Sequence, residues 1–264
     1  MKTAMKSLVL GVALAAASGS ASAISAGGVT WDENSIFDFS ATDTMIELGA
    51  AAVGDTLDGY AKIVTINNTD QATFCASGCE VTYVFGGYTI TSIDIATNTL
   101  VFSGGFIDVY ADPTPNYNGN LQSTATDGNL FLQLEGTLHY DTATGLFGTL
   151  FSDPVPASTG VAGDGRGFLD VTGGLAAAYF DTNTLPIDTD GDGVADSFAD
   201  FQFTSSFQLI PGGPLVSDNQ VAYNLFGSND IQGDSAAVPE PGSLALLGIG
   251  LAGLGMSFRR RKSA

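Results

Sequence analysis

A strand pattern is clearest in Asn129–Leu130–Phe131–Leu132–Gln133–Leu134–Glu135–Gly136–Thr137–Leu138–His139–Tyr140. Alternate positions carry apolar residues, so that one face of a sheet can receive Leu130, Leu132, Leu134, Leu138 and Tyr140. Residues 200–209 alternate in the same way, with Phe201 and Phe203 on one side and Gln202 and Thr204 on the other. This period of two is typical of strands with one buried face.

Short apolar runs separated by Gly, Thr, Ser, Asn and Asp continue through the middle of the chain. Outside these runs, Ser40–Val53 is compatible with a short helix, and Ser228–Ala237 is predicted to be a polar linker. We therefore predict an all-β fold, a single β-sandwich or jelly-roll-like domain over residues 24–237. The further expected strands are Gly59–Ile66, Glu80–Phe85, Tyr88–Ile95, Thr99–Ser103, Phe106–Tyr110, Leu146–Phe151, Gly167–Val171 and Ala176–Phe180.

Three segments share a turn composition that begins with Asp and Thr: Asp94–Leu100, Asp141–Leu146 and Asp181–Leu185. Asp, Asn and Thr side chains bond to nearby backbone, and Asn or Gly tolerates a positive φ. Each segment is therefore predicted to be a turn between strands.

The amino end has the pattern of a secretory signal peptide over residues 1–23. Lys2 and Lys6 precede the apolar run Leu8–Ala17, and Ala21–Ser22–Ala23 forms a cleavage site for signal peptidase. We expect the exported chain to begin at Ile24.

The carboxyl end, residues 238–264, has three parts. Its motif Pro239–Glu240–Pro241 is stiff, because proline cannot continue a helix. The apolar run Leu244–Phe258 would make a helix of about 22 Å, a marginal span for a hydrocarbon core of about 30 Å. Four cations follow and would stop transfer on the cytoplasmic side: Arg259, Arg260, Arg261 and Lys262.

This tail resembles that of the PEP-CTERM proteins of Gram-negative bacteria, which are substrates of the membrane enzyme exosortase. The resemblance covers Val238–Lys262, about a tenth of the chain. It implies that Pro239, Glu240 and Pro241 form the recognition motif, and that the tail is removed after a transient inner-membrane stage. It also implies a final location at the cell surface or in the extracellular matrix. An ordinary tail anchor is the alternative.

The exported part is strongly acidic. Of the 28 acidic residues only Glu240 lies outside residues 24–237, whereas only Lys62 and Arg166 of the eight basic residues lie inside. Such a charge repels nucleic acid and favours divalent cations or cationic partners. Nucleic-acid binding is therefore excluded from the candidate functions.

Cys75 and Cys79 are the only cysteines, and the compartment is expected to be oxidising. A disulfide is predicted, with a small effect on stability because the loop is short. A redox or metal pair is the alternative.

Residues 188–196 follow the calcium-loop pattern D-x-D-x-D-G-x-x-D, similar to dockerin and thrombospondin type-3 loops. Ca²⁺ is the predicted ion. Position 12 departs from the pattern, because Ala199 stands there and Asp200 follows one residue late; a solvated acidic turn is the alternative. The predicted ligands are Asp188, Asp190, Asp192, Asp196 and the carbonyl of Val194.

Three function classes follow. The favoured one is a non-enzymatic surface or matrix protein that acts with exopolysaccharide in biofilm or floc formation, as the resemblance implies and as the order of motifs in flocculation-associated members suggests. The second is a calcium-dependent, lectin-like glycan-binding module, in which Tyr117 or Trp31 could stack on sugars. The third is a secreted hydrolase, which would need a close pair of carboxylates. No catalytic residue is predicted, and the single histidine, His139, is assigned no catalytic role.

Overall fold

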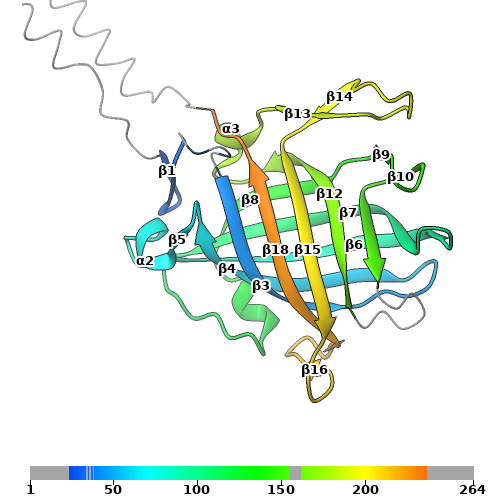
Figure 1. The fold of residues 1–264 in the computed structure, drawn as a ribbon. Coiled ribbons are helices and arrows are strands. Elements are labelled where there is room, and N and C mark those ends of the chain that lie inside the picture. Colours follow the sequence, from blue (N-terminus) through cyan, green and yellow to red (C-terminus); the bar gives the residue numbers. More distant parts are fainter. Residues whose placement is uncertain (1–23, 34, 36, 38, 155–161, 237–264) are drawn as a thin grey trace, which may run out of the picture.

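The computed structural model describes residues 24–33, 35, 37, 39–154 and 162–236. The signal peptide and the sorting tail lie outside these residues. The described part is almost entirely β-structure (Figure 1). Its strands are β1 (Ile24–Ala26), β2 (Val29–Trp31), β3 (Phe39–Leu48), β4 (Thr56–Ile66), β5 (Thr69–Asp70), β6 (Glu80–Asp94), β7 (Thr99–Asp112), β8 (Asn129–Gly136), β9 (His139–Asp141), β10 (Leu146–Gly148), β11 (Leu150–Pro154), β12 (Ala162–Gly173), β13 (Leu185–Ile187), β14 (Ser197–Ala199), β15 (Phe201–Leu209), β16 (Leu215–Val216), β17 (Ala222–Tyr223) and β18 (Leu225–Gly233). Three single-turn helices join them: α2 (Gln71–Phe74), η1 (Gln122–Ala125) and α3 (Ala177–Phe180).

The main sheet is antiparallel and closes on itself. Its order is β11-β12-β15-β18-β3-β4-β6-β7-β8, and β7 and β12 each pair with both β8 and β11. Strand β11 pairs with Leu100–Phe102 of β7, and β8 pairs with Phe106–Ala111 of the same strand. Two short strands thus occupy one place in the ring, end to end. The all-β prediction is confirmed, and the closed sheet resembles a sandwich because its halves share one core.

The core consists of the inward side chains of this sheet. Aromatic residues dominate it, and Trp31, Tyr83, Tyr88, Phe131 and Phe201 are almost completely buried. At one end the Trp31 ring contacts Phe131 and Phe180, at centroid distances of 6.2 and 4.8 Å. Burial of such large rings gives most of the hydrophobic stabilisation of a domain this size.

Two pairs of predicted strands are single long strands. Glu80–Phe85 and Tyr88–Ile95 join as β6, and Thr99–Ser103 and Phe106–Tyr110 join as β7. Gly87, Gly104 and Gly105 adopt a positive φ between these segments without ending the strand, and Gly105 (φ +95°) lies so close to the Tyr88 ring that a Cβ would overlap it. The sequence pattern placed breaks where the chain only bends.

The short helix with which Ser40–Val53 is compatible does not form, because these residues contain most of strand β3. Thr42, Thr44 and Ile46 are β-branched, and the segment lies between β18 and β4, which supply its backbone hydrogen bonds. Tertiary pairing therefore decides its structure.

The predicted linker over Ser228–Ala237 is also wrong. Most of it belongs to β18, in the middle of the sheet between β15 and β3. Its polar residues Ser228 and Asp230 are exposed, whereas Ile231 is buried in the core. A strand segment whose outer face is polar, as from Ser228 to Gln232, has the composition of a linker.

Two smaller differences concern strand ends. Ala176–Phe180 was predicted to be a strand, but α3 forms there and buries Phe180. The stretch Asn129–Tyr140 divides into β8 and β9, and after the break Leu138 is 51% exposed while His139 is buried. The break at Gly136–Thr137 shifts the alternation by one residue.

The two ends of the described chain meet beside α3. The Trp31 Nε1 donates a hydrogen bond to the Ser235 Oγ (3.1 Å), and the Ala236 N–H donates to the Tyr179 carbonyl (2.7 Å). In the part of the chain that the structure describes, no helix is long and apolar enough to cross a membrane.

Candidate functional site

The predicted calcium loop connects β13 and β14, a small hairpin outside the main sheet (Figure 1). Carboxylate oxygens of Asp188, Asp190 and Asp192 lie within 4.8 Å of one another. Asp188 is partly buried, and the other two are exposed. Oxygen ligands at this spacing suit a hard cation such as Ca²⁺.

Backbone N–H groups hold these carboxylates in place. The Asp188 carboxylate accepts hydrogen bonds from the N–H groups of Asp190, Gly191 and Gly193. Desolvation acts to raise the pKa of Asp188, but these hydrogen bonds lower the pKa below its usual value. Gly191 and Gly193 have φ of +81° and +85°, which explains why glycine stands at both positions.

The remaining predicted ligands lie differently. Both carboxylate oxygens of Asp196 accept hydrogen bonds from Thr189 (2.8–2.9 Å), and Asp196 is not part of the three-carboxylate group. Asp200 is buried and accepts the N–H groups of Val171, Thr182 and Asn183. It therefore supports the fold and does not replace the missing ligand at position 12. The Val194 N–H donates to Asp192.

The loop is held against the hairpin β9–β10. The Tyr140 N–H donates to the Asp188 carbonyl (2.8 Å), and the Tyr140 and Phe147 rings lie 5.2 Å apart below Gly191. Phe147 is 44% exposed. The acidic loop thus stands beside a partly exposed aromatic pair.

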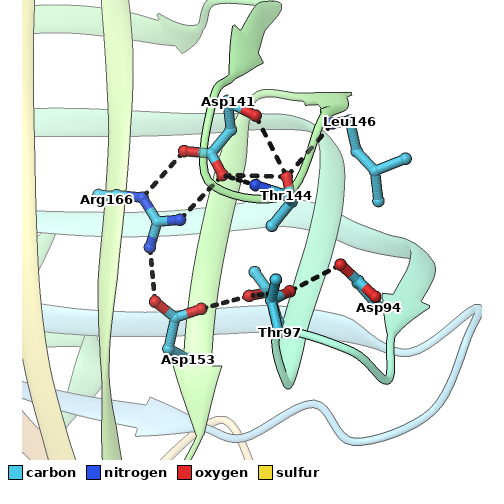
Figure 2. A network of polar contacts seen from close by, with 8 residues as sticks. Asp94, Thr97, Asp141, Thr144, Leu146, Asp153 and Arg166 are labelled. Atoms are coloured by element: carbon cyan, nitrogen blue, oxygen red, sulfur yellow. Dashed lines mark hydrogen bonds and ion pairs between the residues drawn. The ribbon is translucent and has the colours of Figure 1, made fainter.

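Arg166 of β12 ties that hairpin to the main sheet (Figure 2). Its guanidinium forms ion pairs with Asp141 at 3.0 Å and with Asp153 at 2.6 Å. Asp153 continues the network by accepting from Thr99. Burial acts to raise the pKa of Asp141, but the hydrogen bonds from Arg166 and Thr144 lower the pKa below its usual value. The sequence signal for this network is a single arginine in an acidic domain, which by itself does not indicate its partners.

His139 lies under the same hairpin. Its ring contacts Phe151 and Phe168 edge to face, at centroid distances of 5.2 and 4.8 Å, and Nδ1 lies 3.0 Å from the Thr137 carbonyl oxygen. Burial lowers the pKa of His139. This histidine packs between aromatic rings in the described structure.

The predicted aromatic stacking residues do not form a surface. Trp31 is 2% exposed, so it is not available to a sugar, which corrects the sequence interpretation. Tyr117 is partly buried and packs against the small cluster of Tyr60 and Tyr223. Cys75 and Cys79 are buried beside Gly28, and they form a disulfide with their Cα atoms 5.0 Å apart.

The carboxyl-terminal tail lies outside the described residues, and its sequence matches a known family. The model of the PEP-CTERM protein-sorting motif matches residues 237–262. The chain carries a PEP-CTERM sorting signal. The match contains the Pro239–Glu240–Pro241 motif, the apolar run and the basic end, so it identifies an exported protein that exosortase processes through a membrane-anchored sorting step. No curated protein and no solved structure shows a significant match to the chain.

Proposed function

We propose that this protein is a non-enzymatic component of the cell surface or extracellular matrix that acts with exopolysaccharide in biofilm or floc formation. The observation that carries the proposal is the sorting signal, which begins directly after a compact, strongly acidic closed sheet. Export through exosortase delivers such a body to the surface, and its charge keeps it soluble there and attracts cationic partners.

The buried charged groups support a structural body. Glu80 is 1% exposed and pairs with Lys62, and its other oxygen accepts the N–H of Tyr117. Arg166 and Asp200 likewise hold segments of the fold together. Both cations among the described residues are thus used in ion pairs, and the remaining surface is acidic.

Deletion of the gene tests the proposal. We expect weaker aggregation and biofilm with an unchanged growth rate, because an adhesive component contributes to contacts between cells and not to metabolism. Expression of the full chain should restore aggregation. Unchanged flocculation in the deletion strain would contradict the proposal.

A calcium-dependent, lectin-like glycan-binding module is the second candidate. The cluster of Asp188, Asp190 and Asp192 beside Phe147 favours it, because a bound cation and an exposed ring could together hold a sugar. Glycan binding that disappears in EDTA would support this candidate, and glycan binding unaffected by EDTA would exclude it.

A further inference from the structure

The outer face of β12, β15 and β18 carries a groove that is separate from the acidic loop between β13 and β14. The three strands lie side by side (Figure 1), and their register places Asp164 opposite Ser206 and Ser206 opposite Ser228. Two hollows of about 620 and 350 Å³ share these three residues, so they form one continuous groove. Both hollows are wide open to solvent, so an occupant would lie along the surface of the sheet.

The floor of the groove is made of small residues, several of which carry hydroxyl groups. Ser206 and Ser228 lie in its centre with their hydroxyl oxygens 3.2 Å apart, and Thr204 follows on β15. Gly163 and Gly227 line the end near Phe226 and add no side chain. Adjacent strands are about 4.8 Å apart, so hydroxyl groups on neighbouring strands can contact the same sugar ring. Hydroxyl groups both donate and accept, as sugar hydroxyls require.

The rim of the groove is acidic. Asp164 and Asp230 line it, and both are exposed. Arg166 also lines the groove, but its charge is already paired with Asp141 and Asp153. Among the described residues no ion pair neutralises either rim carboxylate. The groove therefore favours a cationic occupant and repels an anionic one.

We propose that this groove binds a linear polysaccharide that carries free amino groups. The ammonium groups of the polymer pair with Asp164 and Asp230, while its hydroxyl groups bond to Ser206 and Ser228 on the floor. The inference rests on the proposed function, because it names the class of polysaccharide and the surface that contacts it.

Titration calorimetry on the exported protein tests the proposal, with a glucosamine hexamer as probe and the N-acetylated hexamer as the uncharged comparison. We use about pH 5.5, where Asp carboxylates are ionised. The glucosamine hexamer is expected to bind more tightly than the acetylated one. Equal affinity for both hexamers, or no binding of either, would overturn the proposal.

Variants distinguish the groove from diffuse attraction to an acidic protein. Ser206→Tyr with Ser228→Tyr fills the floor with residues that strands tolerate, and should weaken binding about tenfold or more. Asp164→Asn with Asp230→Asn should weaken it about three- to tenfold. The matched controls are Ser103→Tyr on β7 and Glu135→Gln on β8, both exposed and outside the groove. If the controls weaken binding as much as the groove variants, the proposal is wrong.

The outcome is separable from that of the proposed function. If the deletion strain aggregates poorly but the groove variants bind like wild type, the groove assignment fails and the matrix role stands. If the groove variants lose binding but the deletion strain aggregates normally, the groove stands and the matrix role fails.

Discussion

Arg166 is the residue on which the outer hairpin depends. It forms two ion pairs, with Asp141 and Asp153, and its guanidinium carbon lies 5.7 Å from the centre of the Phe151 ring. Its side chain is 34% exposed, so solvent weakens these interactions without removing them. The planar guanidinium can bond to both carboxylates at once, which a lysine ammonium cannot do with the same geometry.

We predict that Arg166→Met lowers the free energy of unfolding at pH 7 by about 1–2 kcal/mol. The pKa of Asp141 is lowered in the folded state, so its stabilisation is complete above the unfolded pKa of about 3.9 and is lost as the pH falls through the folded value. Urea unfolding at pH 7 and pH 3 should therefore show a smaller difference between variant and wild type at pH 3. A difference that stays constant with pH would contradict this account. The free energy of unfolding of Arg166→Lys should lie between those of Arg166→Met and the wild type.

We predict a second pH dependence of stability, which arises from His139. Burial lowers its folded pKa, so the unfolded state binds the proton first, and stability falls as the pH drops from about 6.5 towards the folded pKa. His139→Phe should remove the part of the stability loss that occurs between about pH 7 and pH 5. Because this is the only histidine of the chain, the comparison isolates one group. Parallel profiles of Tm against pH for the two proteins would show that the histidine does not titrate as expected.

At the level of elements, sequence predicted best what local chemistry decides. The turns at Asp94–Leu100 and Asp141–Leu146 are confirmed as hairpin turns, and in each the Asp carboxylate accepts from a nearby Thr hydroxyl. Asn98 and Gly145 have positive φ there, as expected. The third turn, at Asp181–Leu185, follows α3 and joins no hairpin of the sheet.

Sequence failed where distant strands decide the structure. β3 and β18 are neighbours in the ring although about 180 residues separate them, and no local pattern shows that pairing. The same contrast between local and distant contacts holds for the predicted ligands of the candidate site. Local spacing brought three of the predicted carboxylates together, whereas the separate placement of Asp196 and Asp200 depends on Thr189 and on β12. The groove was not predicted, because it is made by the register of three strands.

We predict that calcium stabilises the body through the loop between β13 and β14. The cation relieves repulsion among Asp188, Asp190 and Asp192 and binds the folded state only, so calcium at about a hundred times its dissociation constant should raise Tm by roughly 5–10 °C. Asp190→Ala with Asp192→Ala should abolish the shift and leave Tm in EDTA unchanged or slightly higher. Glu135→Gln is the charge control and should keep the shift. Equal Tm values for the wild type in calcium and in EDTA would identify an acidic turn without bound cation.

At the scale of the whole molecule, the first and the last described segments lie side by side. The contact between Trp31 and Ser235 joins residues near the expected first residue, Ile24, to residues just before the sorting signal. The last described backbone contact, from Ala236 to Tyr179, lies three residues before Pro239. A cut near the motif would therefore leave both of these contacts in place.

This arrangement leads to a prediction about processing. The extracellular protein should begin at Ile24 and lack Leu244–Lys262, and its Tm should equal that of a chain cut near Pro239 in vitro, because the hydrogen bonds at Ser235 and Ala236 remain. Intact-mass spectrometry of the extracellular fraction measures both ends at once. A variant with Pro239, Glu240 and Pro241 changed to Ala is the control, and it should keep its tail and stay with the membrane fraction, because the recognition motif is removed. Extracellular protein that still carries Leu244–Lys262 would contradict the prediction that the tail is removed during export.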